Sequence, residues 1–249
     1  MRGEKGGAAP YLSIIIPVLN EETLLGETLR SIDRNPETEV LVADGGSTDA
    51  TRRIAESAGA RVLPAKPGRA VQMNAGAAAS RGEVLLFLHA DTRLPCGYSG
   101  QIQAVLNRPG AVAGAFRLGF DDSRASLRLV AAGANLRSRW RQLPYGDQAL
   151  FVRKDFFVEI GGFRDLPVME DYDLVLRLRR KGRVSLTPGY VTTSPRRWLK
   201  HGIVRTTLIH QFMIAGWHLG ISPSRLAEWH GRKAKAVSDP QVTSSLDDP

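Results

Sequence analysis

Charged side chains that could do chemistry follow several apolar segments of this sequence, and the first set is His89-Ala90-Asp91. The preceding segment, 83–88, is rich in Val, Leu and Phe, which predicts a strand buried on both faces. Open α/β sheets bind their ligands at the carboxyl ends of such strands. Because carboxylate oxygens are hard ligands, Asp91 is a candidate to hold Mg²⁺ or Mn²⁺ against a bound phosphate. The structural alternative is a turn that begins at Asp91.

Two more carboxylates, Asp44 and Asp49, follow the candidate strand 39–43. A nucleotide bound across the ends of the first, second and fourth strands would place its base, ribose and metal beside Asp44, Asp49 and Asp91. The turn after the first strand, Val18-Leu19-Asn20, has none of the glycines that a dinucleotide fingerprint needs. A Walker A lysine loop is also absent from the sequence, so both of these nucleotide-binding classes are excluded.

Strand-like and helical segments alternate through the first half, which predicts right-handed βαβ units and a parallel sheet. Ser47 or Thr48 could cap the second helix. The expected strands are 12–17, 39–43, 61–65 and 83–88, and the expected helices are 21–34, one ending near 58, and 68–80. In the second half we expect an edge strand at 114–120, a strand at 149–152 and helices at 156–163 and 169–181.

Composition narrows the class of protein. Hydrophobic residues make up 43% and charged residues 24% of the 249 residues, as in ordinary globular proteins that fold in water. The net charge of +9 favours anionic partners such as nucleotide diphosphates, phospholipids or nucleic acid. With Cys96 as its one cysteine, the chain can form no internal disulfide and no cysteine-based zinc site. We find no secretory signal and no apolar run of membrane-spanning length, so we expect a cytoplasmic protein.

The segment Ser13-Ile14-Ile15-Ile16-Pro17-Val18-Leu19-Asn20-Glu21, followed by Asp44-Gly45-Gly46-Ser47-Thr48-Asp49, resembles the family 2 glycosyltransferases, which have the GT-A fold. His89-Ala90-Asp91 falls where that family has its metal-binding Asp-x-Asp motif. Gly146-Asp147-Gln148 and Glu170-Asp171 fall where it has its acceptor-side motifs. Each motif alone is weak, but five in the right order are strong, and together they cover roughly residues 12–200. The small bacterial transferase-2-like glycosyltransferases, including those of arsenosugar biosynthesis, are the group that the chain resembles most.

The resemblance implies an α/β fold of the GT-A, Rossmann-like kind, with a mostly parallel central sheet flanked by helices and a C-terminal helical extension. The GT-A domain would span 11–200, with a nucleotide half at 11–95 and an acceptor half at 96–200. We expect a disordered start at 1–10, helices at 201–233 and a flexible tail at 234–249.

On the donor side, the resemblance implies that Pro17, Val18 and Glu21 line the base and the ribose, with Ala90 also contacting the nucleotide. Asp44 would accept a hydrogen bond from the base N–H, a strong bond for an ionised acceptor in a partly dry cleft. The alternative is a strand-end carboxylate that caps the Gly45-Gly46 turn.

Phosphate and metal binding would fall to residues of the next helix and strand. Arg69, at a predicted helix start, could reach the diphosphate with help from the helix N-terminus; a solvated arginine is the equal alternative. Asn74, one turn further on, could face the same cleft. Asp91 would ligate Mg²⁺ or Mn²⁺, and His89 replaces the first acid of the usual pair. His89 is therefore expected to support the metal site more than to ligate firmly.

On the acceptor side, Asp147 and Gln148 would form the floor of the sugar pocket. One carboxylate of Glu170-Asp171 would be the general base that takes the proton of an acceptor hydroxyl. The sequence cannot say which of the two faces the acceptor, and we favour Asp171. Acids in a first helical turn are also expected for dipole reasons alone.

The segment Ser194-Pro195-Arg196-Arg197-Trp198 is similar to the Gln-x-x-Arg-Trp signature of processive family members, but only Arg197 and Trp198 match. Arg197 could bind the diphosphate, and Trp198 could stack on a sugar. His201 is a candidate late metal ligand, with a plain surface histidine as the stronger alternative.

The region 171–205 carries nine Lys or Arg against two Asp, which indicates a solvated face or a docking face for anionic lipid. Helical apolar spacing in 208–219 predicts core or dimer packing, with interfacial membrane contact as the minority interpretation. A homodimer and peripheral contact with the inner membrane face are therefore both candidate states.

The leading hypothesis is a metal-dependent, inverting transferase that moves a sugar from a UDP- or GDP-linked donor to an unknown hydroxyl acceptor. One rival is a nucleotidyltransferase, which would need a basic, Gly-rich loop after the first strand. The other is a protein that binds RNA or an anionic surface. Aromatic residues make up only 7% of the chain, and the acidic motifs would be unexplained, so we expect no nucleic-acid partner.

Overall fold

The structure is a computed structural model that describes residues 11–33 and 35–229. Its first half contains β1 (Leu12–Val18), α1 (Leu25–Arg30), β2 (Thr38–Asp44), α2 (Thr51–Ser57), β3 (Arg61–Pro64), α3 (Arg69–Ala79), β4 (Val84–Phe87) and β5 (Thr92–Arg93). Its second half contains α4 (Tyr98–Leu106), β6 (Ala111–Phe120), α5 (Ala125–Arg141), a 3-10 turn η1 (Gly146–Gln148), β7 (Leu150–Arg153), α6 (Lys154–Glu159), α7 (Glu170–Arg179), β8 (Arg183–Thr193), α8 (Arg196–His201), α9 (Ile203–His218) and α10 (Pro223–Trp229).

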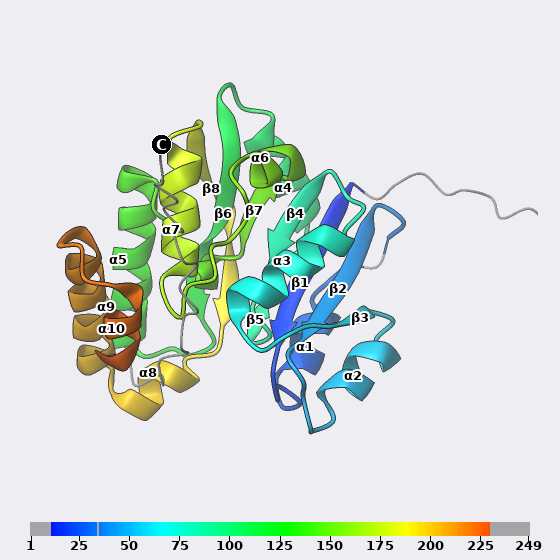
Figure 1. Cartoon of the computed structure of the whole chain (residues 1–249), viewed down its shortest axis with the longest axis horizontal. Helices are drawn as coiled ribbons and strands as arrows, with labels where there is room; N and C mark the ends of the chain where they lie inside the picture. Colours follow the sequence, from blue (N-terminus) through cyan, green and yellow to red (C-terminus); the bar gives the residue numbers. More distant parts are fainter. Residues whose placement is uncertain (1–10, 34, 230–249) are drawn as a thin grey trace, which may run out of the picture.

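The strands of the described part of the chain form one 8-stranded sheet in the order β3-β2-β1-β4-β7-β6-β8-β5 (Figure 1). The pairs β3–β2, β2–β1, β1–β4 and β6–β8 are parallel. The pairs β4–β7, β7–β6 and β8–β5 are antiparallel. The predicted α/β fold with a mostly parallel sheet is therefore confirmed, and antiparallel β7 joins the two halves.

Helices cover both faces of this sheet because its strands are apolar on both sides. In β1, Leu12, Ile14 and Ile16 point into a core shared with α1, α2 and α4. Ile15 points the other way, into a core shared with α3, α6 and α7. A strand that is buried on both faces must be a continuous apolar run, and this is why the first-half strands could be predicted.

The strand that was expected at the sheet edge over residues 114–120 begins earlier, at Ala111, and lies in the interior of the sheet. It is part of β6, which pairs with β7 on one side and with β8 on the other. Its interior position explains its small residues, because a Cβ on Gly114 would lie 2.5 Å from Cζ of Phe151 and 2.6 Å from the carbonyl oxygen of Ser185. The predicted edge strand was wrong for this reason.

The helix cap predicted at Ser47 or Thr48 was also wrong. The Asp49 side chain accepts the backbone N–H of Thr51 (3.0 Å), and Ser47 instead accepts the backbone N–H of Asn20 (3.0 Å). These two loops therefore hold each other at the carboxyl ends of β1 and β2.

The C-terminal helices α9 and α10 lie at one edge of the molecule beside α5, away from β1 to β3 (Figure 1). Met213 and Gly216 of α9 are buried, whereas Leu208, Phe212 and Leu219 are exposed. The predicted apolar face of this helix is thus only partly packed. None of the helices in the described ranges is long and apolar enough to cross a bilayer. The segments predicted to be disordered or flexible, 1–10 and 234–249, and the last positions of 201–233, lie outside the described residues.

We expect Gly114→Ala to lower the free energy of unfolding by about 1–3 kcal/mol, because the added methyl overpacks the β6–β7–β8 contact. Gly100→Ala in α4 is the matched control, since a Cβ there meets no atom within 4 Å. The control should be neutral or stabilising by about 0.5–1 kcal/mol. Urea unfolding of both variants measures the difference, and equal midpoints would contradict this account of β6.

Candidate functional site

The carboxyl ends of β1, β2 and β4 lie at one edge of the sheet, and backbone contacts fix them there. The N–H of Gly45 donates to the carbonyl of Val18 (2.9 Å). The buried amide of Gln72, on α3, donates to the carbonyls of Val18 (2.7 Å) and Ala43 (2.8 Å). The start of α3 is therefore tied to the ends of both strands, which sets where Arg69 lies.

Beside these strand ends lies a cavity of about 110 Å³ that draws side chains from both halves of the chain. It is lined by Arg69, His89, Tyr145, Asp147, Val168, Met169, Asp171, Tyr172, Arg197, His210, Met213 and Ile214. The polar members come from α3, the loop after β4, η1, α7, α8 and α9. A cavity on which several polar and charged side chains converge is a candidate ligand site.

Asp171 is held in this cavity by two backbone donors. Its Oδ2 accepts the N–H of Gly146 (2.6 Å) and its Oδ1 accepts the N–H of Tyr172 (2.8 Å). Burial alone would raise the pKa of Asp171, but the charge of Arg69 and these hydrogen bonds outweigh it and lower the pKa below the usual value. Asp171 is therefore ionised at neutral pH.

Gly146 is the point where three parts of the site meet. A Cβ at this position would lie 3.0 Å from Oδ2 of Asp171 and 3.1 Å from Nε2 of His89. A side chain here would be tight against both groups, so the glycine lets η1, α7 and the loop after β4 approach closely.

Glu170, the neighbour of Asp171, is not among the residues that line the cavity. It is 1% exposed and accepts a hydrogen bond from Nε of Arg69 (2.6 Å), with a second close contact from Nη2. Met169, which precedes it, has φ of 66°, a left-handed conformation that costs about 1–3 kcal/mol for a residue with a side chain. This strained residue opens α7 and itself lines the cavity.

The pKa values of two other cavity groups are shifted in opposite directions. Burial, with the positive charges of Arg69 and Arg197, lowers the pKa of His89 to about 4, so its imidazole is neutral at neutral pH. Burial, with the negative charge of Asp171, raises the pKa of Asp147 to about 6 despite the arginines around it. Oδ1 of Asp147 is buried and has no hydrogen-bond partner among the described residues.

Asp91 lies next to this cavity and contacts Arg196. Nε of Arg196 is 3.3 Å from Oδ2 of Asp91, and its Nη2 donates to Oε1 of Glu21 (2.7 Å). The other oxygen of Glu21, Oε2, is buried without a hydrogen-bond partner among residues 11–33 and 35–229. Arg196 thus joins the candidate metal ligand to the candidate ribose contact.

The side chains near Asp91 could supply part of the coordination of a divalent cation, with the remaining ligands coming from the substrate and water. Within the described ranges, no three His, Cys, Asp or Glu side chains are grouped so as to hold a metal ion. The carboxylate of Asp91 and the neutral imidazole of His89 are the donors on offer. Mg²⁺ and Mn²⁺ commonly complete their shells with phosphate and water oxygens. Oxygens of a bound diphosphate would therefore have to supply part of the coordination.

Residues 13–164 match the sequence pattern of glycosyl transferase family 2. The chain belongs to this family. Among curated relatives, a glucosyl-3-phosphoglycerate synthase of Mycolicibacterium paratuberculosis is 34% identical over 100 residues, which cover 35% of this chain and 30% of the relative. A PGL/p-HBAD biosynthesis glycosyltransferase of Mycobacterium bovis is 41% identical over 96 residues, covering 35% of this chain and 38% of the relative. The chain thus matches about a third of the length of these relatives.

Solved structures of glycosyltransferases share the fold of this family 2 chain. S. aureus TarS (residues 1–349) superposes with a TM-score of 0.60 at 19% identity, covering 74% of this chain and 60% of TarS. Glucosyl-3-phosphoglycerate synthase from Mycobacterium tuberculosis, solved with Mn²⁺, UDP and glucosyl-3-phosphoglycerate, gives 0.56 at 20% identity, covering 75% and 72%. Mannosyltransferase PcManGT from Pyrobaculum calidifontis, solved with GDP-Man and Mn²⁺, gives 0.57 at 21% identity, covering 74% and 56%. These likenesses confirm the predicted GT-A fold.

Not every residue that the family resemblance singled out reaches the cavity. Gln148 is fully buried, and its amide donates to the carbonyl of Phe116 (3.0 Å) and accepts the hydroxyl of Ser138 (2.7 Å). The expectation that it forms the floor of a sugar pocket is therefore wrong: it fixes η1 on β6. Asn74 is likewise used within the protein, because its side chain pairs with the backbone of Phe163 (2.7 and 2.9 Å).

Other predicted positions lie around the cavity or away from it. Asp44 is buried, and its Oδ1 accepts the N–H of Ser47 (3.0 Å), as in the turn-capping alternative. Trp198 is absent from the small cavity, but it packs edge-on against Phe120 and His210 in a larger groove next to it. His201 is exposed at the end of α8.

Several residues in and around the site were missed by the sequence reasoning, among them Arg196, Arg137 and His210. Arg196 lies inside the Arg-Trp motif and was given no role, although its position beside Arg197 was a usable signal. The guanidinium of Arg137 lies 3.5 Å from the centre of the Tyr145 ring, and His210 lines both the cavity and the groove. Nothing in the local sequence of α5 or α9 distinguishes these two, because tertiary packing brings them to the site.

We predict that Asp147→Asn stabilises this family 2 chain above pH 6. A carboxyl group whose pKa rises from an ordinary value near 4 to about 6 on folding opposes folding once it ionises. The wild type should therefore lose stability relative to the variant between about pH 4 and 6, reaching a difference of about 3 kcal/mol at pH 7. Urea unfolding of both proteins from pH 4 to 8 measures this, and a difference independent of pH would contradict it.

Proposed function

We propose that this chain transfers a sugar from a nucleoside diphosphate donor to a hydroxyl group of an acceptor, with inversion at the anomeric carbon. The observation that carries the proposal is one cavity in which Arg69, Arg197 and the carboxylate of Asp171 converge beside the carboxyl ends of the strands. Cations there suit a diphosphate and an ionised carboxylate suits a hydroxyl, in a chain that belongs to family 2.

On the donor side, Pro17, Val18, Glu21 and Asp44 would contact the base and the ribose, with Ala90 beside them. The buried, unpartnered Oε2 of Glu21 supports this role, because hydroxyl groups of a ribose could satisfy it. A UDP- or GDP-linked sugar is the proposed donor. Relatives solved with UDP and with GDP-Man support both possibilities equally.

A divalent ion would be held by Asp91, with His89 in support and the diphosphate completing the shell. Bound there, Mg²⁺ or Mn²⁺ would supply positive charge to the departing nucleoside diphosphate. The presence of Mn²⁺ in two of the similar structures supports this cofactor. Arg196 already neutralises Asp91, so it would have to share that carboxylate with the ion.

On the acceptor side, Asp171 would accept the proton of the attacking hydroxyl while the acceptor oxygen bonds to the anomeric carbon. Glu170 is unsuited to this role, because it is paired with Arg69 and does not itself line the cavity. Arg69 and Arg197 would hold the leaving diphosphate, and Asp147 would contact the sugar or acceptor through its unpartnered oxygen. A single displacement of this kind inverts the anomeric centre.

The membership of family 2 argues against the two rival interpretations, a nucleotidyltransferase and an RNA- or surface-binding protein. The narrower likeness to transferases of arsenosugar biosynthesis stays a prediction, because none of the relatives described above carries that activity. A homodimer and peripheral membrane contact also stay predictions.

We expect UDP or GDP to raise the melting temperature and Mn²⁺ to strengthen the effect, in a panel that also contains CDP and dTDP. A ligand at 100 times its dissociation constant stabilises by about 2.7 kcal/mol, which a thermal-shift assay detects easily. Asp91→Ala should remove the metal-dependent part, whereas Glu56→Ala, an exposed acid on α2, should not. If no nucleotide shifts the transition with any metal, the proposed function fails.

We predict that Asp171→Asn lowers kcat by about 10²–10⁴-fold, the usual contribution of a positioned general base. Its neighbour provides the control: Glu170→Gln should lower stability, because Arg69 loses its buried partner, yet reduce kcat less. Steady-state kinetics with the donor identified above give both values. A larger kcat loss in Glu170→Gln than in Asp171→Asn would contradict the proposal and identify Glu170 as the base.

A further inference from the structure

A groove of about 730 Å³ runs between α5 and α9 and is closed at one end by α8. Its walls are mainly apolar and include Leu129, Leu136 and Trp140 of α5 and Val204 and Leu208 of α9. These five side chains are between 51% and 77% exposed. A contiguous exposed apolar surface of this kind marks a binding site more often than chance.

The two helices are fixed so that these faces remain open. The side chain of Asn135 in α5 pairs with both the N–H (2.7 Å) and the carbonyl (3.0 Å) of Leu118, which holds α5 against β6. Met213 of α9 is buried in a cluster with Val168 and α10. Each helix thus packs through one side and presents the other to the groove.

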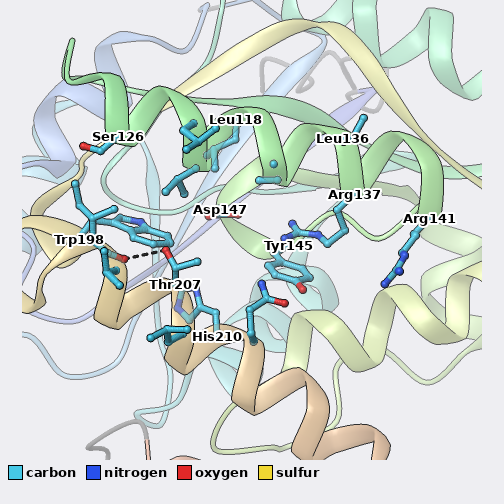
Figure 2. Close-up of a pocket in the computed structure, with 18 of the residues that line it drawn as sticks. Leu118, Ser126, Leu136, Arg137, Arg141, Tyr145, Asp147, Trp198, Thr207 and His210 are labelled. Carbon is cyan, nitrogen blue, oxygen red and sulfur yellow. Dashed lines mark hydrogen bonds between the residues drawn. The ribbon is translucent and has the colours of Figure 1, made fainter.

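The groove leads into the small polar cavity, because Tyr145, Asp147 and His210 line both. In Figure 2, Trp198 and Tyr145 stand on either side of the groove, with Asp147 between them in this view. Two polar atoms at this junction, Oδ1 of Asp147 and the hydroxyl oxygen of Tyr145, are buried without a hydrogen-bond partner among the described residues. Buried polar atoms are rarely left unpaired, so a polar ligand group is expected here.

We propose that the acceptor is amphipathic: its hydroxyl group lies at Asp147 and Asp171, and an apolar chain of the same molecule fills the groove between α5 and α9. This inference rests on the proposed transferase function and adds the chemical class of the acceptor. Polar side chains such as Ser126, Arg141 and Gln211 also line the groove, but most of its exposed surface is apolar and suits an alkyl chain, which needs no hydrogen bonds.

The shape of the groove favours a small molecule over other occupants. Its volume lies within the roughly 300–1,000 Å³ of ligand pockets. A second copy of the chain or a membrane surface would cover the exposed rim but would leave the unpaired atoms of Tyr145 and Asp147 unsatisfied. Continuity with the candidate reaction site therefore assigns the groove to the acceptor.

Gly133 offers a clean way to test this assignment. It lies on α5 in the groove wall, and a Cβ there would meet no atom within 4 Å. Gly133→Leu should therefore project a side chain into the groove without disturbing its neighbours, and leucine favours the helix more than glycine. Gly100→Leu in α4 is the matched control, since Gly100 is also helical with open space around it but lies outside the groove.

The experiment compares the binding of n-octyl β-D-glucoside, below its micelle concentration, with that of methyl β-D-glucoside, by isothermal calorimetry. Each methylene buried in the groove should tighten binding about fourfold, so octyl should bind at least about 100-fold more tightly than methyl. Gly133→Leu should lose most of this preference, and Gly100→Leu should keep it. Equal binding of the two glucosides, or a preference that survives Gly133→Leu, would overturn the proposal.

Parallel measurements separate the other occupants and the proposed function. Sedimentation with vesicles containing anionic phospholipid, and light scattering, test for a membrane face and for a dimer. Vesicle binding or dimerisation that Gly133→Leu abolishes, without an octyl preference in the wild type, would overturn the proposal. UDP or GDP binding with no octyl preference would refute the acceptor class alone. An octyl preference without any nucleotide binding would refute the transferase function and the acceptor role of the groove together.

Discussion

The ion pair between Arg69, which is partly exposed, and the buried Glu170 is the contact on which the geometry of the site depends. It joins the first residue of α3 to the first residue of α7, which are 101 positions apart in sequence. Removing one partner of a buried pair commonly costs several kcal/mol, because the other charge is left without compensation. While the pair holds, Arg69 stays beside the carboxyl ends of the strands, and Asp171, next in sequence to Glu170, stays turned into the cavity.

The charges of the cavity are balanced by that arrangement. Burial, with the charges of Arg69 and Arg197, lowers the pKa of His89, and Arg69 favours the ionised form of Asp171, whereas burial raises the pKa of Asp147. A neutral imidazole where the family has a carboxylate reduces the negative charge available to a metal ion. Arg196 removes more of it by pairing with Asp91. The positive charge of this site therefore resides largely in arginines that belong to the protein.

The first half of the fold could be predicted because its strands are buried on both faces and read as unbroken apolar runs. The second half was harder, since β6 carries small residues where Phe151 and the backbone of β8 approach it, and these resembled an edge strand. The candidate site was predictable in part. Residues that lie at strand ends or in local motifs, such as Asp91 and Asp171, could be named from the sequence. The choice between Glu170 and Asp171 could not, because it depends on how the left-handed Met169 orients α7. Arg137 and His210 depend on helix packing and left no local signal.

Arg197 and Trp198 are consecutive residues of α8, yet one lines the polar cavity and the other lines the apolar groove. A short helix of six residues moves as one body, and it is bounded by Gly202, whose φ is 83°. A ligand that shifts the backbone of α8 at Arg197 would therefore also shift Trp198. Coupling free energies between two sites are reciprocal. If a bound diphosphate changed the affinity of the groove for its ligand by some factor, a ligand in the groove would change the affinity for the diphosphate by that factor. If both substrates bind as proposed, α8 would place one contact to each of them on adjacent residues of the same short helix.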